Sequence, residues 1–238
     1  ESMRLRFHTQ TAGVSLTAQE PENNIIRVAL QGLSAVLGGT QSLHTNSFDE
    51  ALCLPTEKAV KIALRTQQII AHESGVTDTV DPLAGSYYVE WLTNKMEEEA
   101  EKYFQQIEEL GGVIPAIKAN FPQKEIANAS YKYQREIESN ERIIVGVNQY
   151  QQEDQYNVPL LKIDENVAIE QVNKLNNLKQ ERDNNKVQQA LLKLKEAAKG
   201  TENLMPYIMD AIRVYASIGE IINKLKEVFG VYIEDSIF

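Results

Sequence analysis

Hydrophobic and polar residues follow two kinds of pattern in the first third of the chain. Residues 3–8 alternate between apolar and polar side chains, and residues 40–45 can form a strand with two distinct faces. Residues 22–37 and 56–72 carry apolar side chains at steps of three and four, which is typical of amphipathic helices. The order is therefore strand, helix, strand, helix, and the connections are long enough for the two strands to be parallel.

Signals at the helix ends support these boundaries. A Thr-x-x-Glu pattern at residues 17–20 matches a capping box before the first helix, and Gly38 and Gly39 suit a left-handed C-cap after it. The rest of the chain predicts mainly helices. We expect a turn at residues 81–85, helices at 87–110, 113–119 and 124–139 with a break at Pro122, a third strand at 142–148, a surface loop at 149–157 and helices thereafter, with a capping box at 217–220.

These elements predict an α/β fold that is incomplete. A closed eight-stranded (β/α) barrel takes about 250 residues, whereas only three strands are expected here. We therefore predict that residues 1–110 are the last βα units of a TIM-type barrel and that residues 111–238 form a mainly helical extension. Such a piece leaves strand edges and apolar faces uncovered, so we expect it to form an oligomer or to bind another chain.

Polar side chains gather where the first two predicted strands end. These side chains are His8, Gln10, Gln41, Ser42, Asn46 and Glu50. In (β/α) barrels, the C-terminal ends of the parallel strands carry the functional site. The two strands are therefore expected to supply neighbouring walls of one pocket.

Composition excludes several classes of function. The chain has 34 acidic and 24 basic residues and a net charge of −10, which argues against a nucleic-acid partner. No apolar run approaches the ~20 residues that a membrane helix needs, so a soluble protein is expected. The one cysteine, Cys53, lies between two leucines, which favours a small buried residue over a nucleophile. It has no partner for a disulfide within the chain, which fits the reducing cytoplasm.

Five segments, in order, resemble the methylmalonyl-CoA mutase family. They are residues 8–17 (HTQTAGVSLT), 23–27 (NNIIR), 38–52 (GGTQSLHTNSFDEAL), 81–90 (DPLAGSYYVE) and 142–148 (RIIVGVN). The similarity covers essentially the whole chain and is to the C-terminal portion of the large, catalytic subunit. This resemblance implies a TIM barrel that binds acyl-CoA through its axis and closes over adenosylcobalamin, with a radical rearrangement of the carbon skeleton that interconverts methylmalonyl-CoA and succinyl-CoA.

The resemblance also implies roles for individual residues. By the family's pattern, Gln10, Asn46 and Glu50 match residues that hold the deoxyadenosyl ribose. In the same way, His8, Gln41 and Ser42 match residues that line the CoA and acyl part of the substrate. The family's radical-site Tyr, its general-acid His and the Arg that pairs with the substrate carboxylate belong to strands upstream of residue 1.

The Asp-x-His-x-x-Gly pattern of the family's cobalamin domain does not occur in this sequence. The resemblance therefore implies no catalytic residue in this chain. It implies activity only together with the N-terminal barrel portion and a cobalamin-binding domain or subunit, as expected of a segment or split subunit. Ala12 and Val14 stand where the family has Ser and Trp, and Glu1 stands where it usually has a Lys that faces the adenosyl group.

Simpler interpretations exist for the same residues. Glu50 lies three residues after a serine and can complete a capping box, while Gln10 and Gln41 can be hydrogen-bonding residues of a barrel interior. His44 is more often a structural histidine than a ligand. A metal site built from His8, His44 and Glu50 lacks the usual ligand spacing. For the protein as a whole, a non-catalytic scaffold subunit and an isobutyryl-CoA mutase-type enzyme are the alternatives.

Overall fold

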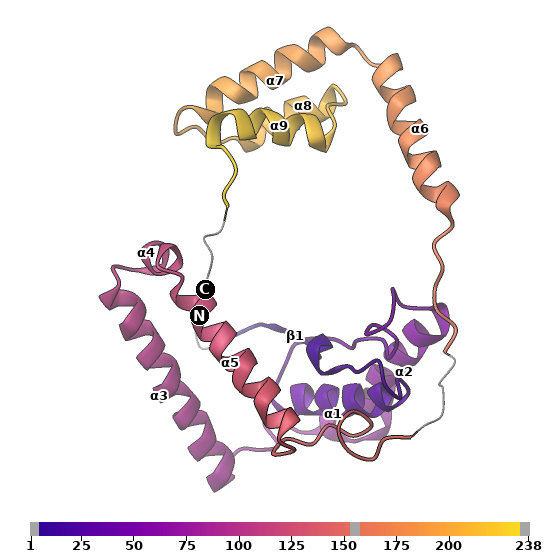
Figure 1. The fold of residues 1–238 in the computed structure, drawn as a ribbon, viewed down its shortest axis with the longest axis vertical. Helices are drawn as coiled ribbons and strands as arrows, with labels where there is room; N and C mark the ends of the chain where they lie inside the picture. Colours follow the sequence, from indigo (N-terminus) through magenta and orange to yellow (C-terminus); the bar gives the residue numbers. More distant parts are fainter. Residues whose placement is uncertain (1–4, 153–157, 234–238) are drawn as a thin grey trace. The chain divides into compact units, whose positions relative to one another are not determined.

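The computed structural model describes residues 5–152 and 158–233. In chain order, the elements are β1 (His8–Gln10), η1 (Gly13–Ser15), α1 (Asn23–Leu37), β2 (Ser42–His44), α2 (Glu57–Glu73), η2 (Val76–Asp78), α3 (Tyr87–Glu109), α4 (Val113–Lys118), α5 (Phe121–Glu138), α6 (Glu165–Glu181), α7 (Asn184–Ala198), α8 (Met205–Arg213) and α9 (Ile218–Phe229) (Figure 1). Within the described ranges, no helix combines the length and the apolar character that crossing a membrane requires.

The chain divides into two compact units, of which the first ends at Leu161 and the second begins at Lys162. Helices dominate both units, and a small parallel sheet lies in the first. This agrees with the predicted mixture of α and β structure. The sequence placed the end of the barrel units between residues 110 and 111. That boundary is not tested by the division into two units, and it stays a prediction.

The two predicted N-terminal strands pair as expected. β1 and β2 are parallel, with His8 opposite Ser42 and Gln10 opposite His44. Their connection runs through α1, which packs against β2 and α2. Each strand has only three residues, so the regular backbone ladder between them is short.

α1 approaches the sheet closely because it carries a glycine at the contact. An added Cβ on Gly32 would lie 3.2 Å from Cδ1 of Ile70 in α2 and 3.6 Å from Cγ2 of Thr45, which follows β2. Such spacing leaves no room for a larger side chain without movement of a neighbour. The side of the sheet that carries Leu43 and Thr45 therefore packs on the helices.

The spans predicted for α1 and α2 are confirmed to within one residue. Gly39 has a φ of 80°, as the predicted left-handed end of α1 requires. The predicted capping box at residues 17–20 is wrong. The N-cap of α1 is Glu22, which makes no side-chain cap hydrogen bond, and the Thr17 hydroxyl instead donates to the Gln19 carbonyl at 2.8 Å.

Helices α3, α4 and α5 form where the hydrophobic pattern predicts them, and the predicted break lies at Ala119 and Asn120, between α4 and α5. Pro122 itself does not end a helix. It occupies the first turn of α5, where the missing N–H costs no intrahelical hydrogen bond. The third strand predicted at residues 142–148 is also wrong. Asn148 accepts a hydrogen bond from the Ile144 N–H and donates to the Ile137 and Arg142 carbonyls, so its amide organises a loop in place of a ladder.

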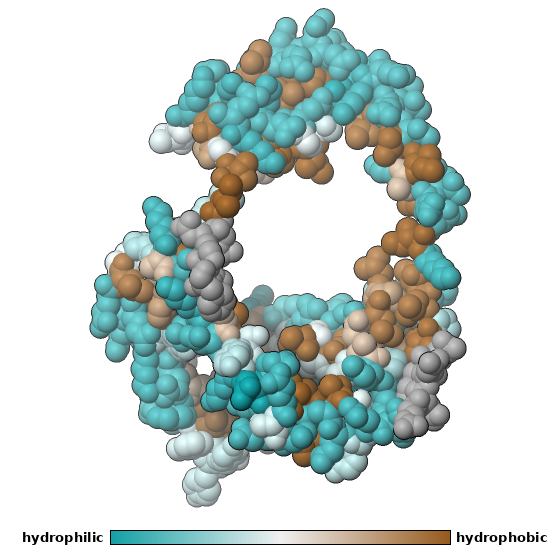
Figure 2. Space-filling model, viewed as in Figure 1, coloured by the Kyte–Doolittle hydropathy of each residue, from teal (hydrophilic) through white to brown (hydrophobic). Residues whose placement is uncertain are grey.

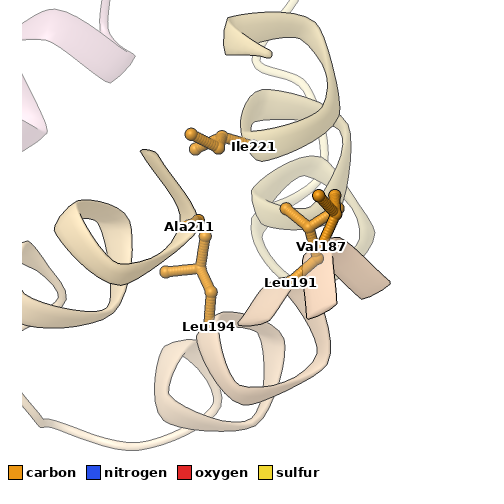
Figure 3. Close-up of a cluster of buried hydrophobic side chains, with 5 residues drawn as sticks. All are labelled: Val187, Leu191, Leu194, Ala211 and Ile221. Carbon is orange, nitrogen blue, oxygen red and sulfur yellow. The ribbon is translucent and has the colours of Figure 1, made fainter. Parts of the chain in front are cut away.

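The second unit has its own hydrophobic core between α7, α8 and α9 (Figure 3). The buried members of this core are Val187, Leu191, Leu194, Ala211 and Ile221. The periodicity of the sequence predicted the α7 positions among them. The opposite surface of α7 is polar, and Figure 2 shows hydrophilic residues over much of that helix.

An ion pair ties the end of α6 to the start of α9. The Arg182 guanidinium, whose side chain is 4% exposed, donates to both carboxylate oxygens of Glu220 and to the Tyr215 carbonyl at 2.6 Å. Glu220 also accepts hydrogen bonds from the Ser217 N–H and hydroxyl, which completes the predicted capping box. These hydrogen bonds, above all those from Arg182, lower the pKa of Glu220 to about 2 against the opposing effect of burial.

We expect the stability of the α7–α9 unit to fall between pH 4.5 and pH 2 because Glu220 must then be protonated. A carboxylate whose pKa is lowered from 4.5 to about 2 contributes up to about 3 kcal/mol, all of it present above pH 4.5. Glu220→Gln should remove this dependence and destabilise the unit at pH 7. Hydrogen exchange of the α7 and α9 amides in the full chain measures the effect.

Glu227 offers a matched control on the same helix. Its pKa is also lowered to about 2, by Lys195 and Lys224, but the pairs lie at the surface, where water screens them. Glu227→Gln should therefore change amide exchange less than Glu220→Gln at pH 7. Equal effects of the two variants would contradict the importance assigned to the Arg182 pair.

Candidate functional site

The face of the sheet turned away from α1 is entirely polar. Because alternate residues of a strand point to opposite faces, His8 and Gln10 share this face with Ser42 and His44. All four residues are exposed. The imidazole Nδ1 of His8 lies 2.7 Å from the Ser42 hydroxyl, so these two predicted substrate-binding residues are in direct contact. Polar side chains on the outer face of a packed sheet are available to a ligand or to further chain.

For residue 44 the sequence favoured a structural histidine over a ligand. His44 is exposed at the C-terminal end of β2, and the described residues offer its imidazole no hydrogen bond. The described chain also holds no group of three or more His, Cys, Asp or Glu residues that could bind a metal ion. Cys53 is half-buried.

The segment after β2 is buried although most of its side chains are polar. Residues 45–49 are all buried, and residues 48–52 form a turn before α2 begins. Asn46 is 4% exposed and accepts a hydrogen bond from the Thr11 hydroxyl at 2.5 Å, while its backbone N–H donates to the same hydroxyl at 2.9 Å. The predicted cofactor residue Asn46 is thus held against the end of β1.

Glu50 joins Asn46 in one polar pair. The Asn46 Nδ2 donates to Glu50 Oε2 at 2.5 Å, and the Ser47 N–H donates to Glu50 Oε1 at 2.7 Å. The second contact is the capping interaction that the sequence allowed, although it closes a turn here and not a helix. Glu50 remains half-buried, and each carboxylate oxygen has a second lone pair that a ligand hydroxyl can reach.

The same turn also starts α2. Asp49 is 0% exposed, and its Oδ2 accepts hydrogen bonds from the Thr56 N–H at 2.9 Å and hydroxyl at 2.7 Å. Thr56 is the N-cap of α2, where its hydroxyl accepts a hydrogen bond from the Ala59 N–H. The polar pair and the N-terminus of α2 are therefore fixed by one compact turn.

Gln41 lies at the other end of the strands. It precedes β2, and its Oε1 accepts a hydrogen bond from the Phe7 N–H at 2.7 Å. Its Nε2 donates to the Gly39 carbonyl at 2.7 Å. Both ends of this amide are engaged with backbone groups, as in the barrel-interior role that the sequence left open, and the substrate-binding role remains a prediction.

Gln10 and Asn46 lie at adjacent strand ends, but the described residues do not enclose them in one cavity. Gln10 is exposed and lines an open cavity of about 340 Å³ with α1 residues, among them Gln31. Asn46 faces Thr11 and Glu50 instead. The structure thus brings the two predicted cofactor residues to the same edge of the sheet and leaves the far wall open.

Sequence reasoning gave no site role to Thr11 or to Asn24 of α1. Thr11 holds Asn46, and the Asn24 Nδ2 donates to the Phe48 carbonyl within the buried turn at 2.8 Å. A usable signal existed for Asn24, since it is the polar member of a buried row with Val28 and Gly32 at steps of four.

Two of the three residues that depart from the family pattern, Ala12 and Val14, lie on the surface. Val14 is 97% exposed, and Ala12 is exposed with its N–H bonded to Gln31. Neither change therefore disturbs packing within the described chain. Glu1 lies outside the described residues.

Comparison with known proteins gives a consistent result. The family model for methylmalonyl-CoA mutase matches residues 1–231. Methylmalonyl-CoA mutase of Rhizobium meliloti (strain 1021) is 47% identical over 234 residues, which is 97% of this chain and 33% of that protein. The 2-hydroxyisobutanoyl-CoA mutase large subunit of Aquincola tertiaricarbonis is 44% identical over 240 residues, covering 100% of this chain and 43% of that protein.

The mitochondrial methylmalonyl-CoA mutase of Homo sapiens is 46% identical over 232 residues, or 97% of this chain and 31% of that protein. The chain thus spans between 31% and 43% of the length of these relatives. The resemblance of the five sequence segments is confirmed by these matches. The chain belongs to the methylmalonyl-CoA mutase family.

Proposed function

We propose that this chain is the C-terminal portion of an adenosylcobalamin-dependent acyl-CoA mutase, an isomerase that rearranges the carbon skeleton of its substrate. The observation that carries this proposal is the half-buried Asn46–Glu50 pair at the C-terminal ends of two parallel strands, in a chain of this family. On this proposal β1 and β2 are the last strands of a TIM-type barrel, and the barrel is completed by chain that this segment does not contain.

The residues at the strand ends fit the ribose of a deoxyadenosyl group. Ribose presents vicinal hydroxyls, which need carboxylate or amide acceptors and amide donors. Glu50 supplies two half-buried acceptor oxygens, and Asn46 and Gln10 supply amides. Only a glycine fits beside Asn46 without crowding, because an added Cβ on Gly13 would lie 3.3 Å from its Nδ2.

Adenosylcobalamin, when bound, supplies the radical chemistry of the rearrangement. The part of this chain is to bind and orient. Glu50 accepts the ribose hydroxyl protons in hydrogen bonds, Asn46 holds Glu50 in place, and Gln10 closes the neighbouring strand end. Amides and hydroxyls hold such a ligand without exchanging protons with it, and the closed site excludes water from reactive species.

The contact between His8 and Ser42 suits the acyl-CoA substrate. These side chains lie on the polar face of the sheet, nearer the N-terminal ends of the strands than Gln10 is. A ligand that passes along the barrel axis would meet them before it reaches the ribose site. Gln41 belongs to this group by the family's pattern, and its hydrogen bond to the Phe7 N–H also supports β1.

The complete enzyme requires an N-terminal barrel portion and a cobalamin-binding domain or subunit. The exposed side chains of Tyr87, Tyr88 and Trp91 support this proposal, because further protein would cover this surface of α3 in the complete enzyme. One relative is named a large subunit, which implies at least one further subunit in that protein. We place the enzyme in the cytoplasm as an oligomer that acts on methylmalonyl-CoA. The isobutyryl-CoA type and the 2-hydroxyisobutanoyl-CoA type differ from it in the acyl group.

Removing the ribose contacts should weaken cofactor binding. In the complete mutase, Gln10→Ala or Glu50→Gln is expected to raise the Kd for adenosylcobalamin by about tenfold, since each change removes one or two hydrogen bonds. Corrinoid absorbance during titration measures the Kd. Gln68→Ala on α2 is the control, because Gln68 contacts Arg65 and lies away from the strand ends. Unchanged binding in both site variants would refute the assignment.

Changes to the proposed substrate-binding residues should weaken substrate binding and leave cofactor binding nearly unchanged. We expect His8→Ala and Ser42→Ala to raise the KM for methylmalonyl-CoA several-fold and to leave the Kd for adenosylcobalamin within about twofold, because a neutral hydrogen bond contributes about 1 kcal/mol. Steady-state turnover with methylmalonyl-CoA, succinyl-CoA and 2-hydroxyisobutanoyl-CoA measures the effect. Absence of turnover with every acyl-CoA in the wild-type complex would favour a non-catalytic scaffold.

A further inference from the structure

Asn24 is a buried amide whose hydrogen-bonding capacity is completely used. It lies in the first turn of α1 and is 0% exposed. Its Nδ2 donates to the Thr17 carbonyl at 2.9 Å and to the Phe48 carbonyl at 2.8 Å. Its Oδ1 accepts from the Thr17 N–H at 3.1 Å and from Arg27 Nη1 at 2.8 Å. Two donors and two acceptor positions are filled, which fixes the orientation of the amide.

One of these partners belongs to the candidate site. The Phe48 carbonyl lies between Asn46 and Glu50 in the chain, inside the turn that brings the two side chains together. Among the described residues, Asn24 is the only α1 residue whose side chain donates to residues 46–50. The backbone of this turn is therefore fixed from α1 at a single point.

We propose that Asn24 is a positioning residue for the Asn46–Glu50 pair, so that its amide sets the geometry of the ribose-binding carboxylate. This inference rests on the proposed function. Its physical basis is that a peptide carbonyl held from one side cannot rotate, and the flanking residues are then restricted to one arrangement. Arg27 orients Asn24 in turn, because its guanidinium bridges Asn24 Oδ1 and the Val145 carbonyl at 2.8 Å.

Asn24→Asp separates this role from packing because it keeps the shape of the side chain. One carboxylate oxygen would still face the Thr17 N–H and Arg27, and it would gain charge complementarity with Arg27. The other oxygen would face the Thr17 and Phe48 carbonyls, which are both acceptors. The variant thus keeps the contacts of Asn24 Oδ1 with the Thr17 N–H and Arg27, which maintain the fold. It loses the hydrogen bond to the Phe48 carbonyl, which anchors the turn.

Asn148→Asp is the matched control. The Asn148 amide also donates to two backbone carbonyls, those of Ile137 and Arg142, and accepts from a backbone N–H, but it contacts no residue of the 46–50 turn. The same change of chemistry is thus made at a residue without a direct hydrogen bond to the ribose pair, in the loop whose Val145 carbonyl binds Arg27. An equal effect of the two variants on the affinity for adenosylcobalamin would therefore contradict a specific role for Asn24.

The test uses the complete mutase and compares two affinities. We expect Asn24→Asp to raise the Kd for adenosylcobalamin about tenfold while the Kd for the acyl-CoA substrate changes less than about twofold, because only the turn is released. Arg27→Gln should give the same selectivity with a smaller effect. Asn148→Asp should leave both affinities within about twofold. Equal loss of both affinities in Asn24→Asp and in Arg27→Gln would overturn the inference.

A second readout needs no cofactor. The Ser47 N–H is hydrogen bonded to Glu50 Oε1, so its hydrogen exchange reports the geometry of the pair. Exchange at Ser47 should be faster in Asn24→Asp than in wild type and unchanged in Asn148→Asp. Unchanged exchange at Ser47 in Asn24→Asp overturns the inference. If the wild-type enzyme fails to bind adenosylcobalamin, the proposed function is overturned and the inference falls with it, whatever the exchange shows.

Discussion

The pairing of two very short parallel strands is the constraint on which the first unit depends. Each strand contributes three residues, and parallel pairs of that length have few backbone hydrogen bonds. Side chains extend the pairing at both ends. Gln41 bonds the Phe7 N–H before the strands begin, and Thr11 bonds Asn46 after they end. The polar residues of the strand ends are therefore part of the fold before they can bind anything.

Burial of these polar groups explains why the site residues are arranged so tightly. An amide or hydroxyl that leaves water without a new partner costs between one and several kcal/mol. Asn46 meets this requirement through Thr11 and Glu50, and Asn24 meets it through four hydrogen bonds to three residues. Asp49 does so through one oxygen, and its Oδ1 has no hydrogen-bond partner among the described residues. Satisfied networks of this kind specify one arrangement, and the ribose contacts that we propose inherit that precision.

The sequence predicted the regular elements well because period and capping signals act locally. The parallel pair, the spans of α1 and α2 and the capping box at Ser217 all follow from such signals. The failures lie where a side chain competes with the backbone. Asn148 takes the hydrogen bonds that a strand at residues 142–148 would need, and the Thr17 hydroxyl bonds the Gln19 carbonyl where a capping box was predicted.

The two units differ in how much of their helical surface packs into a hydrophobic core within the described residues. Helices α7, α8 and α9 enclose a core of five buried side chains, and the Arg182–Glu220 pair, with side chains 4% and 24% exposed, ties α9 to the end of α6 within the second unit. In the first unit, α3 and α5 contain no buried residue, although both carry large aromatic and aliphatic side chains. Apolar surface of that extent is costly in water, and it is normally covered by further protein. The two-stranded sheet and these uncovered helices therefore support the proposal that further chain covers the first unit in the complete mutase.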